Sequence, residues 1–121
     1  MDDKLESLKA IGFSVAGRWR LDGLGGICCE LNELAASRNV LYAFSIDGEL
    51  MYVGKTIQML RTRMAGYRNP GSTQSTNIKN NSNIRQSLAE SKTVDIFVLP
   101  DNGLLHYGLF HVNLAAGLED R

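Results

Sequence analysis

Apolar residues recur at helical spacing near the N-terminus, where Leu5 and Leu8 predict a helix over residues 4–11. The glycine-rich residues 13–26 predict irregular structure. Apolar spacing over residues 27–36 favours a second helix, and a strand near the two cysteines is the open alternative. The first part of the chain is therefore expected to be a mainly helical extension.

The middle of the chain has the pattern of a β-hairpin followed by a helix. Residues 40–46 are almost entirely apolar, and Asp47-Gly48 is a hairpin turn signal before a returning strand over residues 49–54. Thr56 is a candidate N-cap for the next helix, which carries apolar residues at helical spacing and ends near Arg68.

The rest of the chain adds one strand to this hairpin. Residues 72–82 are almost all polar and predict a loop, before a short helix over residues 84–88 and a strand over residues 93–99. We expect an α/β (α+β) fold with a small three-stranded, mostly antiparallel sheet flanked by helices. A chain of 121 residues fits one domain, with residues 1–39 as a helical extension and residues 40–121 as the core.

Composition is that of an ordinary globular protein, with 44% hydrophobic and 21% charged residues. No apolar run approaches the roughly 20 residues that span a bilayer, and the N-terminus shows no signal-peptide pattern. Cys28 and Cys29 are adjacent and unsuited to an ordinary structural disulfide, which favours a reduced, cytoplasmic protein.

The formal net charge is zero, which by itself argues against a nucleic-acid partner. The distribution of charge reverses that argument, because residues 50–89 contain no Asp or Glu. The cations of this stretch are Lys55, Arg61, Arg63, Arg68, Lys79 and Arg85. One segment can therefore present a positive surface while the whole molecule stays neutral.

Two familiar sites are rejected on spacing. Gly54-Lys55-Thr56 lies between a strand and a helix, but a phosphate-binding P-loop needs a further glycine where Glu49 stands. The adjacent cysteines and the two histidines, His106 and His111, lack the spacing of paired zinc ligands.

The order of several motifs resembles the GIY-YIG nuclease superfamily. Val40-Leu41-Tyr42 stands where the family has a strand ending in Gly-Ile-Tyr, and Tyr52-Val53-Gly54 stands for Tyr-Ile-Gly. Arg63 follows on a helix, and Tyr67 occupies the position four residues later where the family usually has His. Glu119 matches the family's last element, a Glu at the start of a C-terminal helix.

The resemblance implies a metal-dependent hydrolysis of phosphodiester bonds. Glu119 would hold Mg²⁺, or another divalent cation such as Mn²⁺, and Arg63 would clamp the phosphate with its planar fork. Tyr42 or Tyr52 would orient or deprotonate the attacking water. A free phenol has a pKa near about 10, so a base role needs a nearby cation, for which Lys55 and Arg63 are the candidates. Tyr67 is a weaker proton carrier than His.

The expected substrate is double-stranded DNA, contacted along the acid-free stretch by Arg61, Arg68, Lys79, Arg85 and Asn83. The C-terminal part resembles restriction-enzyme members more than repair or mobile-element nucleases, which remain the alternative, as does a nucleic-acid-binding module without catalysis. One active site per chain implies a homodimer or sequential nicking. Since Glu119 lies so close to Arg121, we also expect the natural domain to continue, or the chain to be a fragment.

The hairpin register decides whether the two motif tyrosines share a site. A two-residue turn at Asp47-Gly48 would place Tyr42 opposite Val53, with Tyr42 and Tyr52 on opposite faces. A three-residue loop with Gly48 in the left-handed conformation pairs Tyr42 with Tyr52 on one face. Because the nuclease mechanism needs the second arrangement, we predict the bulged loop or another odd-length loop in that register.

Overall fold

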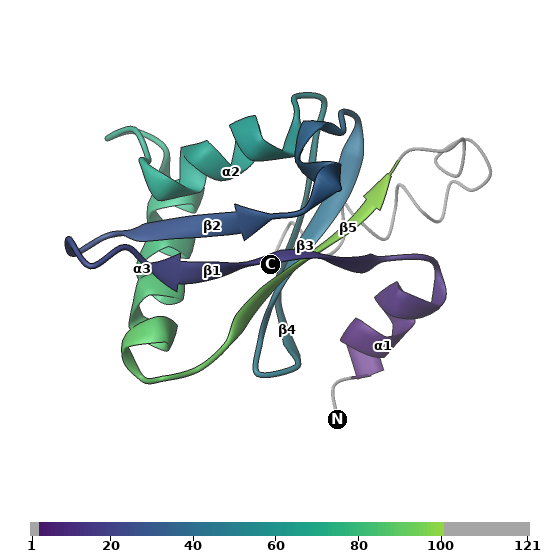
Figure 1. Cartoon of the computed structure of the whole chain (residues 1–121), viewed down its shortest axis with the longest axis horizontal. Helices are drawn as coiled ribbons and strands as arrows, with labels where there is room; N and C mark the ends of the chain where they lie inside the picture. The colour runs from purple at the N-terminus through teal and green to yellow at the C-terminus, as the bar shows by residue number, and fades with distance from the viewer. Residues whose placement is uncertain (1–2, 101–121) are drawn as a thin grey trace.

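The structure, a computed structural model, describes residues 3–100. These residues are arranged around one antiparallel sheet. The sheet has five strands in the order β2-β1-β5-β3-β4 (Figure 1). The strands are β1 (Ser14–Leu21), β2 (Ile27–Leu31), β3 (Val40–Ile46), β4 (Glu49–Thr56) and β5 (Val94–Pro100). The helices are α1 (Asp3–Ala10), α2 (Leu60–Arg68) and α3 (Ser75–Ala89), and η1 (Glu33–Ala36) is a 3-10 turn.

The expected three-stranded sheet is wrong, because β1 and β2 form a second hairpin on the far side of β5. A register shift between Val15 and Gly17 separates the buried residues Ala16 and Trp19 by three positions, so β1 lacks the alternation that identifies a strand. Gly17 is needed there, since a Cβ atom would come within 1.9 Å of the Glu30 carbonyl oxygen. The helical extension expected over residues 1–39 is therefore also wrong beyond α1.

The polar loop expected over residues 72–82 is also wrong, because α3 begins at Ser75. The inner side of α3 is largely polar, with Asn77, Asn80, Ile84 and Ser87 buried at helical spacing. A pattern search based on apolar residues finds nothing to follow in such a helix. Thr56 does not cap α2 either: it ends β4, and the Thr56 hydroxyl accepts from the Gln58 N–H at 3.0 Å.

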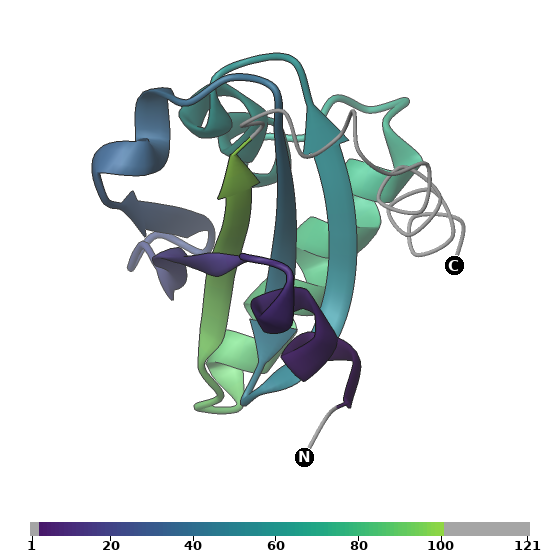
Figure 2. The same ribbon diagram turned by 90° about the vertical axis from the view of Figure 1, so that its right-hand side faces the viewer.

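The helices divide between the two faces of the sheet (Figures 1 and 2). Alternate residues of β3 point to opposite sides, so Tyr42 and Phe44 join the core under α2 and α3, and Leu41 and Ala43 join the core under α1. None of the described helices is long and apolar enough to cross a membrane.

The β3–β4 hairpin places Tyr42 and Tyr52 on one face of the sheet, as predicted, but its turn and register differ from the prediction. Asp47 and Gly48 both have positive φ, 48° and 85°, as a two-residue turn with Ile46 opposite Glu49 requires. A bulge between Phe44 and Ser45 then shifts the register. The predicted pairing of Tyr42 with Tyr52 is wrong, since Gly54 lies opposite Tyr42, but the two phenol rings do share a face, 6.4 Å apart.

Candidate active site

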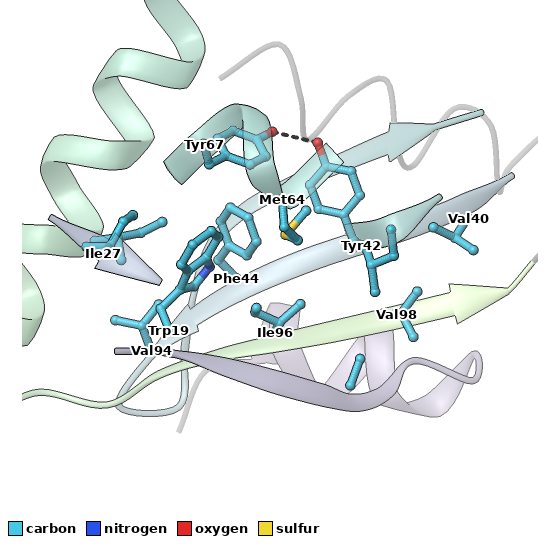
Figure 3. Packing of buried hydrophobic residues seen from close by; sticks show 13 residues of the cluster. Trp19, Ile27, Val40, Tyr42, Phe44, Met64, Tyr67, Val94, Ile96 and Val98 are labelled. Atoms are coloured by element: carbon cyan, nitrogen blue, oxygen red, sulfur yellow. Dashed lines mark hydrogen bonds between the residues drawn. The ribbon is translucent and has the colours of Figure 1, made fainter. Parts of the chain in front are cut away.

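Three polar side chains meet where Tyr42, near the start of β3, faces Arg63 and Tyr67 of α2. The hydroxyl groups of Tyr42 and Tyr67 form a hydrogen bond, drawn as the dashed line in Figure 3, with their oxygens 2.5 Å apart. Arg63 donates from Nε to the Tyr42 hydroxyl at 3.0 Å and from Nη2 to the Tyr67 hydroxyl at 2.8 Å. Its guanidinium also lies over the Tyr67 ring, 4.3 Å from the centroid. Two phenols and one guanidinium therefore form a closed triangle, which we call the Tyr–Tyr–Arg triad.

Local sequence explains how these groups come together. Arg63 and Tyr67 lie one helical turn apart on α2, so their side chains are neighbours on one side of the helix. Gly54 of the Tyr-Val-Gly motif stands opposite Tyr42, and a Cβ atom there would lie 2.5 Å from the Tyr42 hydroxyl. The motif glycine therefore leaves the space that the phenol of Tyr42 occupies.

Burial sets the protonation of the two phenols. Tyr42 is 1% exposed, and this burial raises the pKa of Tyr42 to about 12, although the charge of Arg63 acts in the opposite direction. Burial also raises the pKa of Tyr67, and Tyr42 beside it raises it further. Burial acts to lower the pKa of Arg63, but the neighbouring phenols Tyr42 and Tyr67 outweigh burial, and the pKa of Arg63 is raised. At neutral pH the triad therefore holds two neutral phenols and one cation.

A cleft of about 540 Å³ opens beside the triad, and Arg63 is the triad member on its wall. Lys55 lies on the same wall with its side chain exposed, so the cleft has two cations. No carboxylate within residues 3–100 forms an ion pair with either of them. The lining residues are Asn39, Val40, Lys55, Thr56, Ile57, Gln58 and Arg63.

The sequence matches no known family model and no curated protein. Solved structures do match it. A glutamate-to-alanine mutant of bacteriophage T4 EndoII is 30% identical, with a TM-score of 0.64, and the match covers 78% of this chain and 71% of the EndoII chain. The chain belongs to the EndoII family.

A second solved structure shares the fold of this EndoII-family chain. Restriction endonuclease HPY188I, solved in complex with product DNA, is 19% identical with a TM-score of 0.61. The match covers 82% of this chain and 61% of the HPY188I chain. The fold is therefore nuclease-like, and it is shared with a restriction endonuclease.

The remaining candidate residues of this EndoII-family chain fall into separate places. Tyr52 packs against the triad, with its ring 6.2 Å from that of Tyr67, but its hydroxyl forms no hydrogen bond within residues 3–100. Glu119 lies outside the described residues, as do His106 and His111. Cys28 and Cys29 are free thiols, and residues 3–100 contain no group of three or more His, Cys, Asp and Glu that could hold a metal ion.

The predicted DNA-contacting residues are all on the two helices that cover the triad. Their side chains are largely exposed to solvent, and no ion pair within the described residues uses them. Arg61 and Arg68 belong to α2, and Lys79, Asn83 and Arg85 belong to α3.

Sequence reasoning missed Asn77, which belongs to the same network. The Asn77 side chain is buried, and its Oδ1 atom accepts from Arg63 Nη2 at 3.0 Å. The only sequence signal was its spacing from Asn80, Ile84 and Ser87, which becomes visible once polar residues are allowed on the inner side of a helix.

Proposed function

We propose that this protein is a metal-dependent endonuclease of the GIY-YIG superfamily that hydrolyses phosphodiester bonds of double-stranded DNA, as a restriction enzyme does. The observation that carries the proposal is the Tyr–Tyr–Arg triad beside a cleft with two cations. Membership of the EndoII family and the fold shared with HPY188I, a restriction endonuclease solved with product DNA, support it.

Arg63 is assigned to the phosphate. Its Nε and Nη2 atoms are held by Tyr42, Tyr67 and Asn77, whereas Nη1 has no hydrogen-bond partner within residues 3–100. A guanidinium fixed along one edge keeps its other N–H groups available for a phosphoryl oxygen, where charge develops during hydrolysis. Lys55 on the cleft wall adds a second positive charge for the DNA backbone.

The number of protons in the triad indicates what the two phenols can do. Each phenol oxygen accepts one hydrogen bond from Arg63, and one phenol donates to the other. One O–H group is therefore left without an acceptor inside the triad. Because both pKa values are raised, this O–H group keeps its proton and serves as a hydrogen-bond donor to the attacking water or a phosphoryl oxygen, and removal of a proton from water falls to another group.

Glu119 is the one residue that we assign as a ligand of a divalent cation. The described residues by themselves do not fit a metal, because the triad and its cleft bring no carboxylate together. When bound, such an ion would polarise a phosphoryl oxygen and lower the pKa of a coordinated water. The residues of the triad hold the phosphate and donate the hydrogen bond in either case.

The DNA is proposed to run over α2 and α3, along the acid-free part of the sequence. Both helices cover the face of the sheet that carries the triad, and their exposed cations can bind successive phosphates. Cleavage of both strands then requires a homodimer or two sequential nicks, because the described part of each chain forms one triad.

Nicking of supercoiled plasmid in the presence of Mg²⁺ or Mn²⁺ tests this function. We expect relaxed circles, then linear DNA, and discrete fragments from unmethylated genomic DNA if recognition is sequence-specific. EDTA and Glu119→Gln should each abolish cleavage. Intact plasmid at saturating protein, with retained DNA binding, would contradict catalysis and leave a binding module.

A further inference from the structure

A chain of side-chain amides connects the α2–α3 loop to Arg63. Asn77 Oδ1 accepts from Arg63 Nη2 at 3.0 Å, and Asn77 Nδ2 donates to Gln74 Oε1 at 3.2 Å. The same Gln74 oxygen accepts from the backbone N–H of Gly71 at 2.9 Å. The chain thus runs from a backbone group of the loop to the guanidinium of the triad.

The groups at the two ends of this series of hydrogen bonds fix the orientation of both side-chain amides. The Gly71 N–H can only donate, so Gln74 must present its oxygen, and the Asn77 atom facing that oxygen must be the amide nitrogen. The guanidinium of Arg63 also only donates, and it needs the Asn77 oxygen. If the Asn77 amide were flipped, its nitrogen would face the N–H groups of Arg63, and its oxygen would face the oxygen of Gln74. Neither contact could then be a hydrogen bond.

Asn77 also completes the set of partners of Arg63. A guanidinium has five N–H bonds in one plane. Nε donates to Tyr42, and the two hydrogens of Nη2 are taken by Tyr67 and Asn77. With these three bonds in place the plane of the group is fixed, and only the Nη1 hydrogens are left for another partner.

We propose that Asn77 is a positioning residue of the active site, and that Gln74 holds Asn77 in the required orientation. Asn77 does not touch the substrate; it sets the plane of the Arg63 guanidinium, so that Nη1 meets the phosphate. This inference rests on the proposed nuclease function for its effect on rate, but the arrangement that it describes exists in the free protein.

Cleavage kinetics test the rate effect with three variants of α3. Asn77→Leu should lower kcat by about 10- to 100-fold, the cost of a small misplacement of a catalytic group, while KM changes little. Asn77→Asp keeps the acceptor for Arg63 but loses the donor to Gln74, so it should recover part of the kcat. Asn80→Leu is the matched control, because Asn80 is equally buried on α3 and its side chain bonds, among the described residues, only to the Thr76 carbonyl.

Gln74 gives a second pair of variants that does not threaten folding, since the residue is exposed. Gln74→Leu should lower kcat in the same direction by a smaller factor, and Gln74→Glu should preserve it, because a carboxylate still accepts from Gly71 and Asn77. Equal kcat losses in Asn77→Leu and Asn77→Asp, or an unchanged kcat in Asn77→Leu, would overturn the proposal.

The side-chain Nε–H resonance of Arg63 in ¹⁵N NMR spectra provides a readout without cleavage. The wild type should show a slowly exchanging signal, identified by its loss in Arg63→Lys. Asn77→Leu should broaden it or speed its exchange, and Asn77→Asp and Asn80→Leu should keep it. An unaltered signal in Asn77→Leu would overturn the positioning role, whereas absence of cleavage by the wild type would count against the proposed function alone.

Discussion

The cores on the two faces of the sheet differ in their content of polar groups. The core under α1 consists of apolar side chains, among them Leu5, Leu8 and Phe97, and its cohesion comes from removing them from water. The core under α2 and α3 is also apolar over most of its area, but Tyr42 and Tyr67 bring hydroxyl groups into it. One face therefore contributes mainly stability, and the other combines stability with a hydrogen-bonded polar centre.

The polar groups of the face under α2 and α3 need matched hydrogen-bond partners. A buried hydroxyl or guanidinium without a partner costs about 1–3 kcal/mol or more, so the triad is stable only as a complete set. The α1 face has no comparable constraint, because apolar contacts are not directional. Substitutions should therefore separate the two faces, with stability affected on one and rate on the other.

Arg63→Ala should produce the largest effect on rate. Loss of a group that stabilises developing charge should lower single-turnover cleavage by about 10²–10³-fold or more, with DNA affinity largely retained because other cations hold the backbone. Quenched single-turnover cleavage beside a filter-binding titration measures both quantities. Cleavage within a few fold of the wild type would mean that the polar face is only structural.

Leu8→Ala should give the opposite profile. The Leu8 side chain is 1% exposed in the α1 core, so truncation should destabilise the protein by about 2–5 kcal/mol in urea unfolding. The cleavage rate of the folded protein, measured well below the new midpoint, should not change. A large fall in that rate at full folding would show that the faces are not separable.

The sequence was informative where the inner positions are apolar and regularly spaced. The β3–β4 hairpin and α2 follow from residues 40–46 and from Leu60, Met64 and Tyr67, all three of which are buried. The motifs in this region also led to Tyr42, Arg63 and Tyr67, which the structure brings within hydrogen-bonding distance.

Elsewhere the local pattern was misleading for physical reasons. The register shift in β1 removed its alternation, and the asparagines on the inner side of α3 looked like loop residues. In the hairpin, local turn preference held at Asp47-Gly48, and the bulge that corrects the register further along the strands had no sequence signal. Asn77 was missed because its partner, Arg63, is distant in sequence.

The salt dependence of binding should change less than the cleavage rate. Replacing both Lys79 and Arg85 of α3 with Ala removes two exposed cations. If each contacts a phosphate, the slope of log K against log salt should become shallower by about 1.8, since each contact contributes about 0.9. Fluorescence anisotropy between low and moderate salt measures the slope, and an unchanged slope would place the DNA on another surface.

Alkaline titration should reveal the smallest effect. The folded state keeps Tyr42 protonated above the ordinary phenol pKa, since its own pKa is raised to about 12. The neutral phenol therefore favours the folded state, and this contribution is present below about pH 10 and lost as the pH rises towards 12. The phenolate absorbance near 295 nm should show fewer ionised tyrosines at pH 10.5 in the wild type than in unfolded protein. The same ionised fraction in both states would contradict the burial of the phenols.

Tyr42, Tyr67 and Arg63 should act as one unit in cleavage, and a double-mutant cycle measures whether they do. The measurement is the single-turnover cleavage rate of Tyr42→Phe, Arg63→Ala and the double variant, each checked for folding. If the phenol acts together with the guanidinium that it holds, the double variant should cleave no more slowly than Arg63→Ala alone. A double variant whose loss equals the product of the two single losses would contradict a common role, because the two side chains would then act independently.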